Sequence, residues 1–265
     1  MKPETLAILR SPRLHEPLRL VSEPGPGGIP QQVLVSASSG QRYVLRDGIP
    51  LLLDEDSVSG PNRRYQGLYN RAARFYDPAM RLFARVASGG EQSFRKGYLQ
   101  RLGVHAGQRV LEVSVGTGAN LRCLPPGATC FGLDISWGML ARCRANLRKW
   151  QLEAELFLGN AEDLPFCDEC FDVVYHVGGI NAFNDRGRAL AEMVRVARSG
   201  SKLLVVDETA KLLESMSWSP TARRMLKEQS DRLHAPADLL PAGMADVQVT
   251  DIARGWLYCL TFAKP

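Results

Sequence analysis

Residues 110–120 read VLEVSVGTGAN, and this stretch decides the fold. Its first half is rich in valine and leucine, which is typical of a strand that is buried on both faces of a sheet. Gly116 and Gly118 follow, and glycines at the end of such a strand let a ligand approach the backbone closely. Open α/β sheets bind ligands at the carboxyl ends of their strands. The stretch therefore predicts a parallel sheet with a binding turn after its first strand.

The chain beyond this turn alternates between apolar strands and amphipathic helices, which predicts an α/β fold with a mostly parallel, Rossmann-like sheet. Two closing strands joined by a short turn require one antiparallel member. Strands are expected at 129–133, 155–158, 171–176, 202–206, 247–249 and 256–262, and helices at 121–123, 136–150, 186–197 and 221–233.

The first hundred residues have a different texture. Residues 1–54 are short apolar pieces broken by proline and glycine, which is typical of a small β-rich domain. Residues 61–102 have apolar and aromatic residues at helical spacing and predict helices. We therefore expect three parts, which are a small domain at 1–57, a helical lid or linker at 58–104 and a main domain at 105–265.

Composition limits the class of protein. The chain has 265 residues, of which 45% are hydrophobic and 23% charged, as in ordinary globular proteins. No apolar run approaches the roughly 20 residues that span a bilayer, and the six cysteines do not form a disulfide framework, so we expect a cytoplasmic protein without a transmembrane segment. The net charge is +5, with a basic excess between residues 61 and 101. This excess indicates either a solvated helix face or a surface for anions.

Polar residues follow the next two expected strands. Asp134 ends the second strand, where its carboxylate can accept hydrogen bonds from ribose hydroxyls or cap the following helix. Asn160 follows the third strand, where it can pair with an adenine edge or form an ordinary turn. The glycine turn lacks the third glycine of the dinucleotide fingerprint, and no phosphate-binding lysine follows it. This pattern favours a nucleoside without a pyrophosphate.

Residues from about 108 to 263 resemble the class I S-adenosylmethionine-dependent methyltransferases, in particular the branch that contains the ubiquinone and menaquinone biosynthesis enzymes. The resemblance rests on motifs in the same order, at 111–118, 132–136, 139–140, 159–166, 171–174 and 192–196. It implies a seven-stranded sheet with a reversed last strand, S-adenosyl-L-methionine as methyl donor and S-adenosyl-L-homocysteine as product. It also implies a set of cofactor-binding residues, which are Glu112, Gly116, Thr117, Gly118, Asp134, Ile135, Met139, Asn160, Ala161 and His176.

The acceptor side is less defined by the sequence. His176 falls where the reacting sulfur is expected, as a general base, a substrate contact or a hydrogen-bonded residue at a strand end. Asn181 is a candidate substrate contact, and Tyr65, Tyr69 and Tyr76 are candidates for a lid over the cofactor or a substrate pocket. Methyl transfer from an activated donor needs positioning and desolvation, so a base is not obligatory, and no metal is expected.

Residues 6–53 resemble the small zinc-ribbon protein that activates certain RNA and protein methyltransferases. Metal-binding members have two Cys-x-x-Cys pairs, and here Ser11, Leu14, Ser36 and Ser39 stand at those positions. We therefore predict a degenerate, metal-free ribbon that serves as a structural or substrate-capping domain. The one Cys-x-x-Cys of the chain, at 167–170, precedes a strand and is interpreted as a turn.

The sequence favours an enzyme of small-molecule biosynthesis that methylates a small, hydrophobic or aromatic acceptor. An RNA or protein methyltransferase is the first alternative, because of the ribbon and the basic segment, although no Asn-Pro-Pro-Tyr motif follows the fourth strand. A non-catalytic subunit that binds S-adenosylmethionine, with a regulatory or scaffolding role, is the second. The acceptor atom and the oligomeric state are left open.

Overall fold

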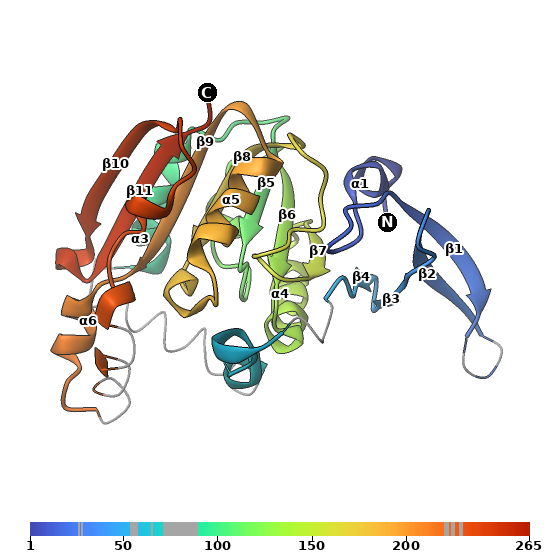
Figure 1. The fold of residues 1–265 in the computed structure, drawn as a ribbon, viewed down its shortest axis with the longest axis horizontal. Helices are drawn as coiled ribbons and strands as arrows, with labels where there is room; N and C mark the ends of the chain where they lie inside the picture. The colour runs from blue at the N-terminus through green and yellow to red at the C-terminus, as the bar shows by residue number, and fades with distance from the viewer. Residues whose placement is uncertain are drawn as a thin grey trace.

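The computed structural model describes residues 1–25, 27, 29–53, 58–64, 66–70, 90–219, 223, 226–227 and 230–265. Within these residues, a central seven-stranded sheet has the order β10-β11-β9-β8-β5-β6-β7 (Figure 1). Its strands are β5 (Arg109–Val113), β6 (Thr129–Asp134), β7 (Glu155–Leu158), β8 (Phe171–Val177), β9 (Ala197–Glu208), β10 (Ala245–Ile252) and β11 (Leu257–Ala263). Among the described helices, none is long and apolar enough to cross a membrane.

The directions of the strands confirm the expected fold class. Strands β5 to β9 pair in parallel, whereas β11 is antiparallel to both β9 and β10. The sheet is therefore Rossmann-like and mostly parallel, with a reversed last strand. Strand β9 is longer than the strand expected at 202–206. It begins at Ala197 and continues through Asp207 to Glu208.

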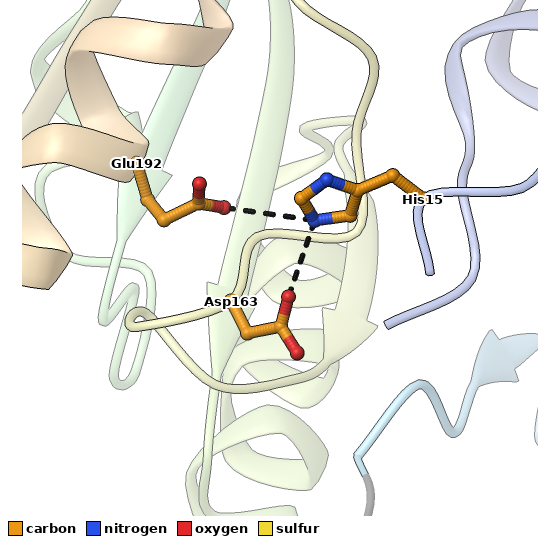
Figure 2. A group of neighbouring side chains, drawn as sticks. All are labelled: His15, Asp163 and Glu192. Atoms are coloured by element: carbon orange, nitrogen blue, oxygen red, sulfur yellow. Dashed lines mark hydrogen bonds and ion pairs between the residues drawn. The ribbon is translucent and has the colours of Figure 1, made fainter. Parts of the chain in front are cut away.

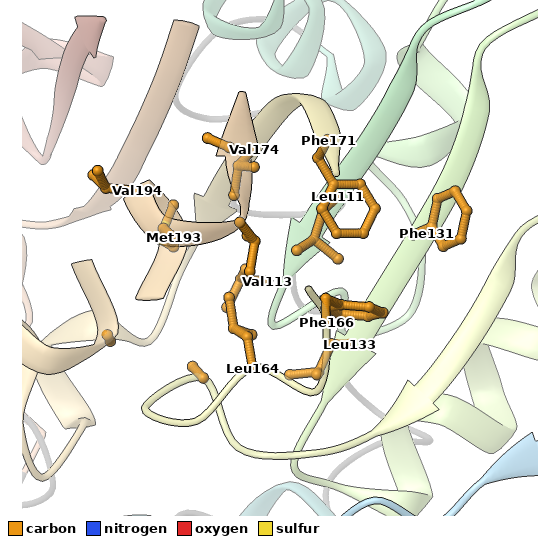
Figure 3. Packing of buried hydrophobic residues seen from close by; sticks show 14 of the residues in the cluster. Leu111, Val113, Phe131, Leu133, Leu164, Phe166, Phe171, Val174, Met193 and Val194 are labelled. Carbon is orange, nitrogen blue, oxygen red and sulfur yellow. The ribbon is translucent and has the colours of Figure 1, made fainter. Parts of the chain in front are cut away.

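Alternate residues along the strands build a separate core on each face of the sheet. On one face, Leu111 and Val174 join Met193 of α5 (Arg186–Val196) in a buried cluster (Figure 3). On the other face, Val110 and Val173 pack with Tyr98 of α3 (Glu91–Leu99). The helices thus cover both faces, as the alternation of strands and helices predicts.

Two expected helix starts are confirmed in detail. Ser136 caps α4 (Trp137–Trp150), because its hydroxyl accepts a hydrogen bond from the backbone N–H of Met139 at 3.2 Å. Asp185 caps α5 in the same way, with Arg188 as donor at 2.9 Å.

The region between β9 and β10 agrees with the expected helix only in part. Of the helix expected at 221–233, residues 221–222, 224–225 and 228–229 lie outside the described residues. Residues 223, 226 and 227 are helical, whereas Ser230–Arg232 form the 3-10 turn η6. The short helices α1 (Pro3–Ile8) and α6 (Ala210–Ser215) were not indicated by the sequence pattern.

The N-terminal region forms a second, antiparallel sheet in the order β1-β2-β3-β4. Its strands are β1 (Leu18–Pro24), β2 (Pro30–Ser36), β3 (Arg42–Arg46) and β4 (Ile49–Pro50). This confirms a small β-rich unit, whereas the domain boundaries at 57 and 104 stay predictions. The unit attaches beside β7, where the backbone N–H of Leu52 donates to the carbonyl of Leu158 at 2.8 Å and that of Cys167 donates to Ile8 at 2.8 Å.

The carboxylate of Glu16 connects the segment before β1 with the turn after β2. Glu16 accepts hydrogen bonds from the hydroxyls of Ser36 and Ser39 and from the backbone N–H of Ser39. The backbone N–H of Glu16 in turn donates to the hydroxyl of Ser11 at 3.0 Å. These hydrogen bonds, first that from the Ser36 hydroxyl, lower the pKa of Glu16 below its ordinary value of 4.5.

The lowered pKa gives a prediction for the Glu16→Gln variant. A carboxylate whose pKa is lower in the folded state stabilises the fold above its unfolded pKa, and this contribution is lost as the pH falls through the folded pKa. The protection of the Ser39 amide against hydrogen exchange, taken relative to its intrinsic exchange rate at each pH, is therefore expected to fall below about pH 4.5 in the wild type. In the variant this protection is expected to be lower and less pH-dependent. Glu4→Gln, at an exposed position of α1, is the matched control. Equal pH dependence in all three proteins would contradict the assigned role of Glu16.

Candidate active site

Two adjoining cavities open at the carboxyl ends of β5, β6, β8 and β9. The larger has a volume of about 270 Å³ and the smaller about 60 Å³. Both are lined by the same central residues, namely Tyr69, Ser114, Gly116, Val177, Gly178 and Gly179. The position agrees with the expectation that ligands bind where the parallel strands end.

The turn after β5 forms the floor shared by both cavities. Gly116 has a φ of +55°, and a Cβ at this position would meet no atom closer than 4.0 Å, so its backbone lies open to a ligand. Gly118 has a different role, because a Cβ there would lie 2.7 Å from the Sγ of Cys143 on α4. Gly118 therefore permits the close packing of the turn against α4.

Asp134 lies at the end of β6 and lines the smaller cavity together with Ile135 and Met139. One carboxylate oxygen accepts a hydrogen bond from the backbone N–H of Gly116 and the other from that of Ser136, both at 2.8 Å. Burial raises the pKa of Asp134 to about 6, against these two hydrogen bonds. Gly116, Asp134, Ile135 and Met139, four of the residues expected to bind the cofactor, thus line one cavity.

Glu112 lines the larger cavity from the middle of β5 and is fully buried. Its carboxyl oxygens accept hydrogen bonds from the side chains of Asn120 at 2.5 Å and Tyr175 at 2.9 Å. Burial raises the pKa of Glu112 to about 8, and the two hydrogen bonds oppose this rise. Thr117 also lines this cavity.

The sequence did not reveal the residues that surround Glu112. Arg95 and Tyr98 of α3 both donate to the side-chain oxygen of Asn120 at 2.7 Å, which connects the helical segment to the glycine turn. Tyr98 belongs to a helical stripe in the sequence, but its spacing predicts packing rather than a polar contact.

The segment expected to form a lid is described in part. Residues 60–64 and 66–70 are helical, and Tyr69 lines both cavities. Gln66 donates to the carbonyl of Ile135 at 3.0 Å, and the side-chain oxygen of Asn70 accepts from the hydroxyl of Ser136 at 2.7 Å. Tyr65 and Tyr76 lie outside the described residues.

Of the described residues that line the two cavities, none is Asn160, Ala161, His176 or Asn181. Asn160 accepts from the backbone N–H of Glu162 at 3.0 Å, which is turn chemistry, and Ala161 is buried. His176 is fully buried, its Nδ1 lies 3.0 Å from the carbonyl of Val113, and burial lowers its pKa. Their roles at the cofactor stay predictions.

Asn181 does not line either cavity but is hydrogen-bonded to the end of β9. Its backbone N–H donates to Asp207 at 3.0 Å, and its side-chain amide donates to the carbonyl of Glu208 at 2.9 Å. Asp207 and Glu208 themselves line the larger cavity. The sequence pattern did not single them out, because they lie beyond the expected end of that strand.

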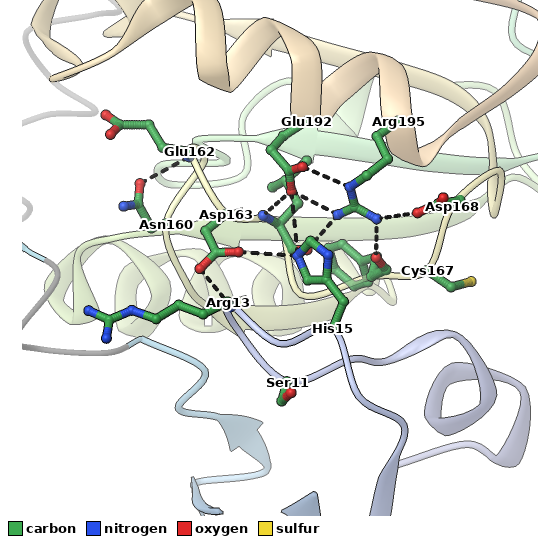
Figure 4. Close-up of polar contacts among 12 residues, drawn as sticks. Ser11, Arg13, His15, Asn160, Glu162, Asp163, Cys167, Asp168, Glu192 and Arg195 are labelled. Atoms are coloured by element: carbon green, nitrogen blue, oxygen red, sulfur yellow. Dashed lines mark hydrogen bonds and ion pairs between the residues drawn. The ribbon is translucent and has the colours of Figure 1, made fainter. Parts of the chain in front are cut away.

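A cluster of polar side chains outside the two cavities joins the N-terminal unit to the main sheet. The Nε2 atom of His15 lies 3.2 Å from a carboxylate oxygen of Asp163 and 3.9 Å from one of Glu192 (Figure 2). Arg195 donates to both oxygens of Glu192 at 2.7 Å and to Asp168 at 2.7 Å (Figure 4). Because the guanidinium already neutralises Glu192, this cluster fits an interdomain contact better than a metal centre.

Comparison with known proteins agrees with this geometry. Residues 111–205 match a family model described as a methyltransferase domain. The demethylmenaquinone methyltransferase of Mycobacterium sp. (strain KMS) is 34% identical over 142 residues, which cover 53% of this chain and 57% of that protein. The phosphatidylethanolamine N-methyltransferase of Cereibacter sphaeroides is 37% identical over 107 residues, covering 40% of this chain and 53% of that protein.

The fold also matches solved structures. A chain from the complex between the Haloferax volcanii Trm112 methyltransferase activator and a methyltransferase superposes with a TM-score of 0.58 at 20% identity, covering 74% of this chain and 97% of that chain. Residues 111–205 are therefore similar to a methyltransferase domain, and the sheet that contains them has the same fold as that chain. The chain spans about half to three fifths of the length of the curated relatives it matches.

Proposed function

We propose that this protein transfers a methyl group from S-adenosylmethionine to a small hydrophobic or aromatic acceptor. The observation that supports it is the joined pair of cavities, with Asp134 in one and Glu112 in the other. The smaller cavity suits a nucleoside, since Asp134 can accept hydrogen bonds from ribose hydroxyls while Ile135 and Met139 offer apolar contacts to a base. Glu112 and Thr117 would hold the amino acid part of the cofactor.

The chain's own part in the reaction is to position the two reactants and to exclude water. S-adenosylmethionine supplies a methyl group already activated by a positively charged sulfur. Tyr69 lines both cavities, and part of the larger cavity offers an apolar surface to an acceptor. That surface is made by Phe94, Val177, Val206, Leu212 and Leu257.

The names of the relatives indicate two acceptors to test, a naphthoquinol and phosphatidylethanolamine vesicles. Protein is incubated with methyl-labelled S-adenosylmethionine and one of these acceptors, or with bulk tRNA to test the first alternative. We expect the label in a small molecule that organic solvent extracts. Label only in RNA or protein would favour the first alternative, and binding of the cofactor without transfer to any acceptor would favour a non-catalytic subunit.

We further propose that the N-terminal unit is a ribbon that has exchanged its metal for a carboxylate. In support, the Glu16 carboxylate accepts hydrogen bonds from Ser36 and Ser39, two of the four positions where ribbons have cysteine. The backbone N–H of Glu16 donates to Ser11 at a third position. Leu14, at the fourth position, is 58% exposed. Serine and leucine side chains are poor zinc ligands, so the purified protein is expected to contain no zinc bound through this unit. One equivalent of zinc that resists dialysis and is lost on removing residues of this unit would contradict the proposal.

A further inference from the structure

Two neighbouring carboxyl groups, those of Asp207 and Glu208, line the larger cavity at the end of β9. They lie beside the backbone of the loop that follows β8, since Gly179 donates its N–H to Asp207 at 3.0 Å. The other walls on this side are apolar, from Val177, Val206, Leu212 and Leu257. An acceptor that enters the cavity therefore meets a pair of acids beside these apolar side chains.

The two acids differ in their surroundings. Asp207 is 1% exposed, and its oxygens accept hydrogen bonds from the backbone N–H groups of Gly179, Asn181 and Glu208 at 2.9–3.0 Å. Three such donors hold the Asp207 side chain in place beside the loop. Burial, and then the charge of Asp207, raise the pKa of Glu208 well above its ordinary value of 4.5. Burial and the neighbouring acid thus favour the protonated form of Glu208.

Three further titratable side chains lie around the pair. Tyr258 of β11 lies near both acids, and burial raises its pKa. His176 of β8 lies near Asp207, and burial lowers its pKa. Arg186 of α5 lies near Tyr258. Glu112 lines the same cavity and its pKa is also raised, so a change of charge in the cavity can act on both carboxyl groups, and a variant must assign the proton.

We propose that Glu208, backed by Asp207, accepts the proton that the acceptor loses during methyl transfer. This inference rests on the proposed function, which places one positive charge, the sulfonium, in the joined cavities. That charge favours an ionised Glu208. The acceptor atom then forms its bond to the methyl carbon as the carbon–sulfur bond breaks and leaves its electron pair on sulfur. The acceptor's proton passes to the Glu208 carboxylate, so a positive and a negative charge disappear together.

This charge balance defines the class of acceptor. The reacting group must carry a proton that it loses on methylation, as a hydroxyl or an amine does, and it must stand on an apolar frame that suits the walls of the larger cavity. The methylation of an acceptor that loses no proton, such as a tertiary amine or a thioether, would not be accelerated by Glu208 as a proton acceptor.

The inference can be tested before the acceptor is known. The probes are S-adenosylmethionine and S-adenosylhomocysteine, which share every charged group except the sulfonium. Calorimetric titration near pH 7 in buffers of different ionisation enthalpy counts the protons released on binding. We expect S-adenosylmethionine to release more protons than S-adenosylhomocysteine. Glu112 and Asp134 also have raised pKa values, and the subtraction removes the part of their proton release that both ligands cause.

The Glu208→Gln variant assigns the proton. In this variant, the difference between the two ligands is expected to vanish while S-adenosylhomocysteine still binds. Glu214→Gln, at an exposed position of α6, should keep the wild-type difference. Equal proton counts for the two ligands in the wild type, or an unchanged difference in Glu208→Gln, would overturn the inference alone. No binding of either ligand to the wild type would overturn the proposed function and this inference with it.

Discussion

Replacing Phe166 with alanine is expected to lower the free energy of unfolding by about 3–5 kcal/mol, the range for removing a large aromatic side chain from a core. Phe166 is fully buried, and its ring meets those of Phe157 and Phe171 edge to face, with centroids 5.1 and 5.0 Å apart. It lies in the loop after β7, where Leu9 of the N-terminal unit forms a β-bridge with it. The side chain therefore fills the core where the two units meet.

Urea-induced unfolding measures this effect. Val247→Ala is the control, because Val247 lies on the edge strand β10 and is 44% exposed, and such surface changes usually stay within about 0.5 kcal/mol. A loss below about 1 kcal/mol in Phe166→Ala would contradict the close packing described around this ring.

Replacing Asp134 with alanine is expected to weaken the binding of S-adenosylmethionine about tenfold to hundredfold, which corresponds to about 1–3 kcal/mol for hydrogen bonds to a charged group. The carboxylate lines the smaller cavity and also holds the backbone of Gly116 and Ser136 in place. Asp134→Asn keeps one acceptor oxygen and should lose less. The exposed Asp238→Ala should bind as the wild type does.

The pKa of Asp134 adds a pH dependence to this prediction. Because burial raises this pKa to about 6, the ionised form that accepts two ribose hydrogen bonds is lost as the pH falls below that value. Affinity in the wild type should therefore decrease below about pH 6, and Asp134→Ala should lack this component. Equal affinity of wild type and Asp134→Ala across this range would show that the carboxylate has no part in binding.

The sequence predicted the features that depend on local pattern. The glycine turn, the strand ending at Asp134 and the cap at Ser136 each need only a few neighbouring residues, and all three lie where they were expected. The lid residue Tyr69 also lines both cavities. These positions follow from strand and helix periodicity and from the rule that parallel strands bind ligands at their carboxyl ends.

The remaining site residues depend on contacts between distant segments. Arg95 of α3 donates a hydrogen bond to Asn120 in the glycine turn. The helical spacing of apolar residues within 91–99 does not indicate that partner. Asp207 lines a cavity only because β9 extends past the apolar run that ends at Val206. Glu16 acquires its role from two serines that lie about 20 residues away on β2 and the following turn. A single sequence cannot reveal such tertiary pairs, because local propensity does not specify them.

The central claim is that the joined cavities bind S-adenosylmethionine, and equilibrium dialysis of the wild-type protein against the labelled cofactor tests it most directly. The account predicts saturable binding of one molecule per chain, displaced by S-adenosylhomocysteine and weakened in Asp134→Ala. A folded protein that shows no saturable binding, or binding that Asp134→Ala leaves unchanged, would contradict it.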